Sequence, residues 1–180
     1  MRLIAGFLLG AMLALPAAAR PLTSEEETGL AQSMDLYLRA IGSGNAERIV
    51  KGIPPRILNI FAGTAGIEAK NLEKTLIDQT AAMMAGSRFS DIAADRAALD
   101  AGDAVLADGT AVTWVVVPTA FTAETGGART RNAQPMLALR EGDRWYFVRI
   151  DGDQQKQMVT IAYPFLSEVR FPAATVTPVQ

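Results

Sequence analysis

The chain has 180 residues, with 17 lysines and arginines against 19 aspartates and glutamates, and a formal net charge of −2. It contains no histidine and no cysteine, which excludes histidine bases, Ser-His-Asp triads, thiolate nucleophiles, and metal sites built on histidine or thiolate. The mild acidic excess, without a cluster of lysines and arginines, argues against nucleic acid or an anionic membrane surface as partner.

The first 19 residues have the layout of a secretory signal peptide. Arg2 precedes an apolar run from Leu3 to Leu15, and Ala17 and Ala19 form an A-x-A cleavage site. The run is shorter than the roughly 20 apolar residues of a membrane-spanning helix. We therefore predict cleavage after Ala19, a periplasmic location, and no stable membrane insertion of the mature chain. An uncleaved membrane anchor is the alternative.

Helical periodicity dominates the first half of the mature chain. Ser24 and Glu27 have the spacing of a capping box, and apolar residues then recur at helical intervals. Asn45 can cap a short helix that runs through Val50. Gly86 closes the last helical pattern. The predicted helices span about residues 25–41, 46–50 and 67–85, with a further turn opened by Pro54-Pro55.

After Gly86 the hydrophobic period changes, and SRFSDIAADRAALD is interpreted as a strand. Asp108-Gly109 is a strong tight-turn signal between two apolar runs, and two further glycine turns follow. The predicted antiparallel strands lie near residues 103–107, 111–123, 129–140 and 144–150. The segment DQQKQMVTIAYPFL can begin as a short helix before Pro164, and residues 173–180 are expected to be a loose tail.

Helices followed by long hairpins are the order of an α+β fold in which helices pack on one face of an antiparallel sheet. Three stretches carry a resemblance to a known family: VVVPT (Val115 to Thr119), MLALREGDRWYFVRIDG (Met136 to Gly152) and YPFLSEVRFP (Tyr163 to Pro172). They resemble the nuclear-transport-factor-2-like superfamily, with its cystatin-like cone fold, and more narrowly secreted bacterial members without an assigned activity. The resemblance implies a single domain over residues 20–172, a cone-shaped α+β barrel with a strongly curved sheet.

The stretch TWVVVPTAF has apolar side chains on both faces of its predicted strand. One face carries Val115, Val117 and Phe121, and the other carries Trp114, Val116 and Ala120. In the cone fold, one face lies under helices and the other often contacts a second subunit. We therefore expect a homodimer through the sheet, with Val115, Val117 and Phe121 at its interface. The alternative is a strand covered on both faces by its own chain. Pro118 should lie at a bulge or an unpaired stretch.

The resemblance also implies a cavity between helices and sheet, which similar proteins use for catalysis or for holding small apolar molecules. Trp145, Phe147 and Arg149 alternate onto one side of the last long strand, so Arg149 would be the polar group of an apolar pocket. Tyr37 and Asp35 are candidates for its rim. The alternative is that both aromatic residues belong to the ordinary core, with Arg149 paired to a neighbouring carboxylate such as that of Asp151.

Three hypotheses for function remain open. The first is a secreted, non-enzymatic binding module that holds a small apolar or anionic ligand, or a protein partner, through its cavity or sheet face. The second is a lyase or isomerase that uses a buried carboxylate of raised pKa. The third is a structural or inhibitory partner of another secreted protein. No motif in the sequence calls for a cofactor or a metal ion.

Overall fold

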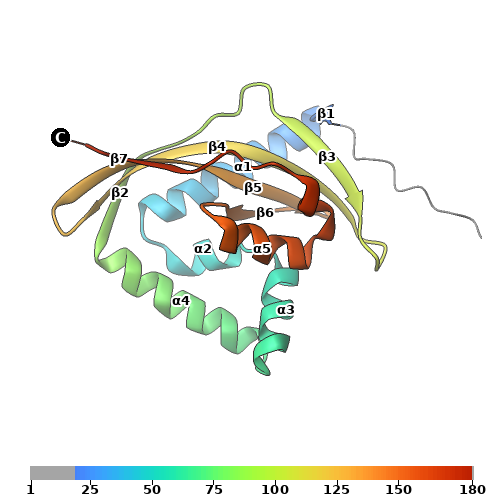
Figure 1. Ribbon diagram of the computed structural model, residues 1–180, viewed down its shortest axis with the longest axis horizontal. Helices are drawn as coiled ribbons and strands as arrows, with labels where there is room; N and C mark the ends of the chain where they lie inside the picture. The colour runs from blue at the N-terminus through green and yellow to red at the C-terminus, as the bar shows by residue number, and fades with distance from the viewer. Residues whose placement is uncertain (1–18, 180) are drawn as a thin grey trace, which may run out of the picture.

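The computed structural model describes residues 19–179, in which one antiparallel sheet lies between two sets of helices (Figure 1). The helices are α1 (Ser24–Gly42), α2 (Ala46–Lys51), α3 (Pro55–Ala65), α4 (Ala69–Ala85), α5 (Asp153–Ala162) and the short 3-10 helix η1 (Pro164–Glu168). The strands are β1 (Arg20–Pro21), β2 (Ser87–Ala94), β3 (Asp100–Val105), β4 (Ala111–Thr125), β5 (Ala128–Glu141), β6 (Arg144–Arg149) and β7 (Thr175–Pro178).

The predicted signal segment falls almost entirely on residues 1–18, which lie outside the described residues. Cleavage after Ala19 therefore stays a prediction. Within residues 19–179, none of the helices has the length and apolar character needed to cross a membrane.

Helix α1 begins one residue earlier than the predicted capping box. Thr23 is the N-cap, and its hydroxyl accepts from the Glu26 backbone N–H at 3.3 Å, while the Glu26 carboxylate accepts from the Thr23 N–H at 2.8 Å. Ser24 and Glu27 are both helical residues instead. The shift has a local cause, because Arg20 holds the Glu26 carboxylate through two hydrogen bonds of 2.8 Å and so favours Glu26 as the reciprocal partner.

The sheet contains seven antiparallel strands arranged around the long hairpin of β4 and β5. β4 pairs with β5 along nearly its whole length. Its other edge pairs first with β3 and then, beyond Pro118, with β2. The outer edge of β5 likewise pairs with β7 and then, beyond Pro135, with β6. The α+β class and the antiparallel sheet are thus confirmed, but the sheet of the described residues is open and does not close into a barrel.

Two prolines lie opposite each other where both long strands change their outer partners. Pro118 pairs with Pro135 across the hairpin. The Pro118 carbonyl accepts from the Asp95 N–H at 2.9 Å, and the Pro135 carbonyl accepts from the Ile150 N–H at 3.1 Å. The carbonyl groups of both prolines therefore point away from the hairpin. Since proline has no N–H, the gap between two partners is where it is tolerated. On its outer side Pro118 thus lies in the gap between β3 and β2, as expected, although its carbonyl is hydrogen-bonded there and its inner side pairs with Pro135.

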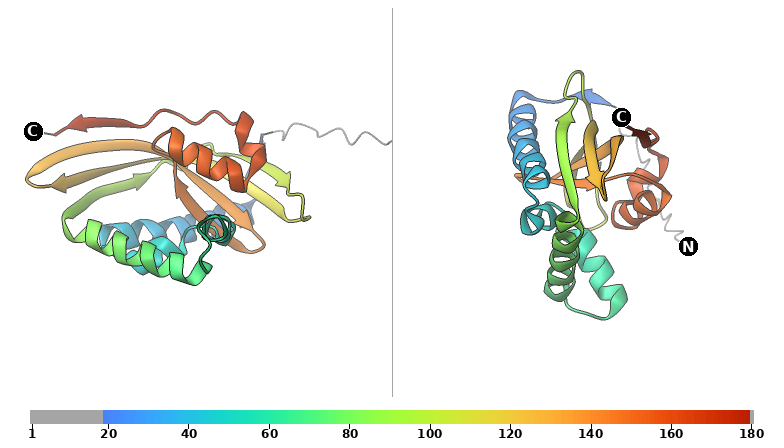
Figure 2. Two further views of the ribbon diagram at one scale, coloured as in Figure 1. Left: turned by 60° about the horizontal axis from the view of Figure 1, so that its bottom comes forward. Right: turned by 90° about the vertical axis from the view of Figure 1, so that its left-hand side faces the viewer.

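Each face of the sheet is covered by a different part of the same chain, as the end-on view of Figure 2 shows. On one face, α1 contributes Leu30, Met34 and Tyr37 to a core with the inward residues of β4, β5 and β6. On the other face, α5 and η1 contribute Val159, Tyr163 and Leu166. For β4 this cover is unequal, because the face beneath α1 is buried whereas Trp114, Val116 and Ala120 on the opposite face are half-buried.

This arrangement corrects the expected interface. Val115 and Val117 are 0% exposed and pack in the core beneath α1, so neither side chain can contact a second subunit. Phe121 lies on the same helix-covered face and contacts Phe89 of β2, with ring centroids 5.7 Å apart. The chain fully covers the face that carries Val115 and Val117, but on the opposite face Trp114, Val116 and Ala120 are only half-buried. The homodimer stays a prediction.

The C-terminal segment also differs from expectation. Residues Thr175–Pro178, expected to be loose, form β7 and pair with residues 130–133 of β5. All four residues of β7 are exposed, so side-chain burial does not hold them there. The physical reason is the outer edge of β5, whose backbone N–H and C=O groups beyond the end of β6 offer a template for one more strand.

A partly buried hydrogen bond at the start of η1 links it to the sheet and gives a first testable prediction. The Tyr163 hydroxyl donates to Glu141 Oε1 at 2.6 Å, and Arg56 Nε lies 3.7 Å from the same oxygen. Burial, and then the bond to Glu141, raise the pKa of Tyr163 above its ordinary value. We expect Tyr163→Phe to lower the free energy of unfolding by about 2 kcal/mol, since it leaves the carboxylate short of a buried donor.

Urea denaturation measures this loss. Tyr146→Phe is the matched control, because Tyr146 is also buried but its hydroxyl makes no hydrogen bond within residues 19–179. Equal losses in the two variants would contradict a specific role for the bond between Tyr163 and Glu141.

Candidate functional site

A cavity of about 180 Å³ lies between the helices and the inward face of the sheet. We call it the inner cavity. Its apolar lining comes from α1, α2, α4, β2, β4 and β5 and consists of Leu38, Ile41, Ile49, Met83, Met84, Phe89, Ile92, Phe121 and Met136. Its polar lining consists of Tyr37, Thr80, Thr119, Gln134 and Arg149. The position between helices and sheet is the one in which a ligand cavity was expected.

Gln134 is the unusual polar group of the inner cavity. It is 9% exposed, and its side-chain amide makes no hydrogen bond to the residues that the structure describes. The neighbouring Thr119 hydroxyl donates instead to the Gln134 backbone carbonyl at 2.8 Å. Among the described residues, the fully buried side-chain atoms without a partner are Arg56 Nε and Trp114 Nε1, so the amide atoms of Gln134 keep some contact with solvent. The amide lines the inner cavity and is accessible to donate to and accept from a molecule there.

Tyr37 forms a wall of the inner cavity from α1. Its ring packs on Phe147 with centroids 4.9 Å apart, and a Cβ at Gly52 would lie only 2.7 Å from it, so Gly52 leaves room for the ring. Burial raises the pKa of Tyr37 to about 12. The hydroxyl is consequently protonated at physiological pH and can donate a hydrogen bond. It makes none within residues 19–179.

Arg149 lines the inner cavity but is not buried in it. Its side chain is 48% exposed and pairs with Asp151 at 2.6 Å. The expected position beside an apolar pocket is thus correct, and so is the alternative pairing with Asp151. Arg149 lies at the rim of the cavity, where it can reach an anionic group only by sharing its guanidinium with Asp151.

Asp35, Trp145 and Phe147 do not line the inner cavity. Asp35 forms an ion pair with Arg96 at 3.0 Å, because two helical residues turn it through about 200° from Tyr37 and away from the sheet. Trp145 and Phe147 share the inward face of β6, as predicted, but both belong to the buried core. The candidate site thus keeps Tyr37 and Arg149, and it loses the other three residues.

Gln134 was missed at the sequence level, although a signal was present. It is two residues before Met136 and four before Ala138 in a strand, so the alternation of side chains places all three on one face. Met136 and Ala138 are core residues of that face. A polar side chain in register with two buried apolar ones marks a position where a ligand or a buried partner is expected.

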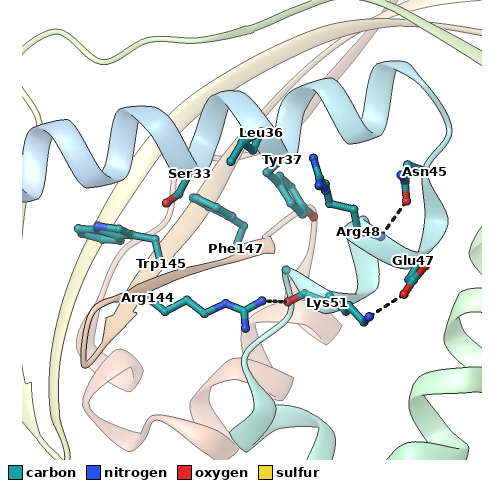
Figure 3. Close-up of a pocket in the computed structure, with 11 residues that line it drawn as sticks. Ser33, Leu36, Tyr37, Asn45, Glu47, Arg48, Lys51, Arg144, Trp145 and Phe147 are labelled. Carbon is teal, nitrogen blue, oxygen red and sulfur yellow. Dashed lines mark hydrogen bonds and ion pairs between the residues drawn. The ribbon is translucent and has the colours of Figure 1, made fainter.

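A second hollow of about 420 Å³ lies on the outer side of Tyr37 and Phe147, between α1, α2 and β6 (Figure 3). We call it the basic groove. Its cationic side chains are Arg48, Lys51 and Arg144, its one carboxylate is Glu47, and its floor contains the rings of Tyr37, Trp145 and Phe147. Tyr37 and Phe147 lie between the basic groove and the interior, and Tyr37 lines both hollows.

The chemistry available to the inner cavity follows from its lining. No aspartate or glutamate is among the described residues that line it. Within residues 19–179, no three carboxylates come together in a way that could hold a metal ion. The lining offers hydrogen bonds from the amide of Gln134, the phenol of Tyr37 and the hydroxyl of Thr80 in largely apolar surroundings, a composition typical of small-molecule binding sites.

Comparisons with known proteins add no relative to this description. No protein-family model matches the chain, and neither the curated proteins nor the solved structures contain a match to it.

Proposed function

We propose that the protein is a secreted, periplasmic, non-enzymatic binding module that holds a small, mainly apolar molecule in the inner cavity. The observation that carries the proposal is the largely apolar inner cavity, whose lining includes the accessible amide of Gln134, an amide that makes no hydrogen bond within residues 19–179. A guest with one hydrogen-bonding group would satisfy this amide and fill the apolar space. The curved sheet with its helices on the inward side also supports membership of the nuclear-transport-factor-2-like superfamily, with its cone shape, as part of the same proposal.

The size of the inner cavity limits the guest. Its volume of about 180 Å³ is slightly larger than the roughly 150 Å³ of an engineered apolar cavity that accommodates benzene. A substituted benzene ring or a short aliphatic chain fits this space, and a fatty acid of ordinary length does not. The polar group of the guest would meet Gln134 and Tyr37. An anionic group would in addition attract Arg149 at the rim.

The hypothesis of a carboxylate-dependent lyase or isomerase has less support. It requires an acid within the cavity, and the described lining contains none. Asp35, the acid first considered, is paired with Arg96 outside the cavity. The hypothesis of a structural or inhibitory protein partner has no observation in its favour.

Titration with benzyl alcohol, benzoate and toluene tests the proposal. At saturating concentrations, we expect benzyl alcohol and benzoate to raise the melting temperature by about 3 °C or more, because a ligand that binds only the folded state stabilises it. Gln134→Leu should weaken benzyl alcohol binding about tenfold and leave toluene binding in place, since only the hydrogen bond is lost.

Gln32→Leu is the matched control, because Gln32 is exposed on α1 and outside the inner cavity. The proposal is wrong if none of the three compounds shifts the melting temperature or the methyl resonances of Met84 and Met136. It is also wrong if Gln134→Leu binds benzyl alcohol as tightly as the unmodified protein. Native mass spectrometry of protein purified from its own periplasm then identifies the natural guest and counts the subunits.

A further inference from the structure

The basic groove concentrates positive charge on a chain that is negative as a whole. Three cationic side chains, those of Arg48, Lys51 and Arg144, face one carboxylate, while the formal charge of the full chain is −2. The three cations come from two elements, α2 and β6, that are far apart in the sequence. Figure 3 shows Arg144 and Lys51 below the rings of Trp145 and Phe147, and Arg48 apart from them beside Tyr37.

Arg144 and Lys51 are each held in place by a contact that leaves other N–H groups free to bind an anion. Arg144 donates to the Lys51 carbonyl at 3.1 Å, and its guanidinium carbon lies 5.0 Å from the centre of the Tyr146 ring. These contacts fix the guanidinium and leave most of its five N–H groups available. Lys51 is held by Glu47 at 2.6 Å. Both positions are pre-organised, which lowers the entropy lost when an anion binds.

Arg48 has no such contact. Within residues 19–179 its side chain makes neither an ion pair nor a hydrogen bond, and it is exposed at the groove. Glu47 pairs with Lys51, and nearby Glu73 also raises the pKa of Lys51, so the surroundings of the groove hold a second carboxylate. Within residues 19–179, Arg48 and Arg144 make no ion pair. Arginine pairs with phosphate through two parallel hydrogen bonds, and a phosphate monoester carries a charge of roughly −1.5 to −2 at pH 7.

The rest of the groove suits the organic part of such a ligand. Leu36 is 44% exposed above a floor of buried aromatic rings, and the hydroxyl of Ser33 makes no hydrogen bond within the described part of the chain. A ring or short chain attached to the phosphate can contact Leu36. A long polyanion is disfavoured, because the remainder of the chain carries a net negative charge.

We propose that the basic groove is a second binding site, specific for the phosphate group of a small phosphate monoester that Arg48 and Arg144 contact from different sides of the groove. This site is separate from the inner cavity, because neither arginine lines that cavity. The proposal therefore does not depend on the proposed function.

Phenyl phosphate is the probe, with benzoate and inorganic phosphate as comparisons. We expect calorimetric titration to show phenyl phosphate binding about tenfold more tightly than benzoate, because the dianion engages both free arginines. Arg48→Gln should weaken binding about tenfold or more, and Arg144→Gln should do the same. Arg129→Gln is the control, since Arg129 is exposed at the far end of the β4–β5 hairpin.

The two tryptophans of the chain can show where phenyl phosphate binds. Trp145 lies in the floor of the basic groove, and Trp114 does not line it. Phenyl phosphate should shift the indole N–H resonance of Trp145 and leave that of Trp114 unchanged. Gln134→Leu should still bind phenyl phosphate, which separates this site from the inner cavity.

Three outcomes would overturn the proposal. The first is unchanged affinity for phenyl phosphate in the double variant of Arg48 and Arg144. The second is a shift of both tryptophan resonances together. The third is binding only to vesicles that contain phosphatidylglycerol, without binding of phenyl phosphate, which would identify a lipid surface as the source of the phosphate groups.

Discussion

Replacing Val117 by aspartate is expected to unfold the protein. Val117 is 0% exposed, lies in the middle of β4, and packs beneath α1 with Met34 and Val115. A carboxylate at this position has no cationic partner, and burying an unpaired charge costs several kcal/mol, which is comparable to the whole stability of a domain. Circular dichroism at pH 7 should show loss of the cooperative thermal transition.

The same experiment decides between a core and an interface role for this strand. Val105→Asp is the matched control, because Val105 is 74% exposed at the end of β3, and its replacement should change the stability by less than about 0.5 kcal/mol. An interface role predicts a different result for Val117→Asp: a folded protein of smaller assembled mass. That outcome, seen by circular dichroism and light scattering together, would show that the strand is covered by a second subunit.

Local sequence signals were sufficient for most of the secondary structure. The turn at Asp108-Gly109 was recognised because a positive φ at its second position, 84° at Gly109, is readily adopted by glycine. Asn45 was recognised as a helix cap because its side chain can accept the Arg48 N–H, which it does at 3.0 Å. These features depend on residues a few positions apart, so the sequence alone is enough to predict them.

Features that depend on distant partners were not predictable in the same way. The apolar residues of β4 predicted burial on both faces, but the outer face of β4 is only half-buried over Trp114 and Val116, because α5 and η1 return over a cluster that includes Leu137 and Leu139 of β5. The tail residues Thr175–Pro178 became β7 because an edge of β5 was free, which no local pattern in the tail reveals. Thr23 and Ser24 are equally good caps by type, and Arg20 favours the first by holding Glu26.

In the candidate site, too, features set by local sequence were predicted, and features set by distant partners were not. Tyr37 and Arg149 were identified because periodicity places them on inward faces of α1 and β6, and both line the inner cavity. Asp35 was misplaced because nearness in sequence to Tyr37 does not mean a shared helix face. The basic groove was not predicted, since Arg48 and Arg144 are far apart in the chain and line one hollow only because α2 and β6 both pack against α1.

Acid is expected to weaken the N-terminal anchor of the fold. Arg20 bonds to both Glu26 and Asp103, which ties the start of α1 and the strand β3 to one guanidinium. The hydrogen bond from Arg20 lowers the pKa of Glu26 to about 2, against an ordinary value of 4.5. Because the folded-state pKa is the lower one, this stabilisation is fully present above about pH 4.5 and is lost as the pH falls towards 2.

We expect Glu26→Gln to lower the free energy of unfolding at pH 7 by about 2 kcal/mol, less than the full pKa difference implies, because the side chain of Arg20 is 33% exposed and solvent screens the pair. Urea denaturation at pH 7, 4.5 and 2.5 should show the gap between the two proteins closing across the two lower values. Glu27→Gln, at an exposed neighbouring site, is the control. A gap that persists unchanged at pH 2.5 would mean that Glu26 acts through packing and not through its charge. Signal cleavage after Ala19, which stays a prediction, would leave Arg20 in the mature chain and this anchor complete.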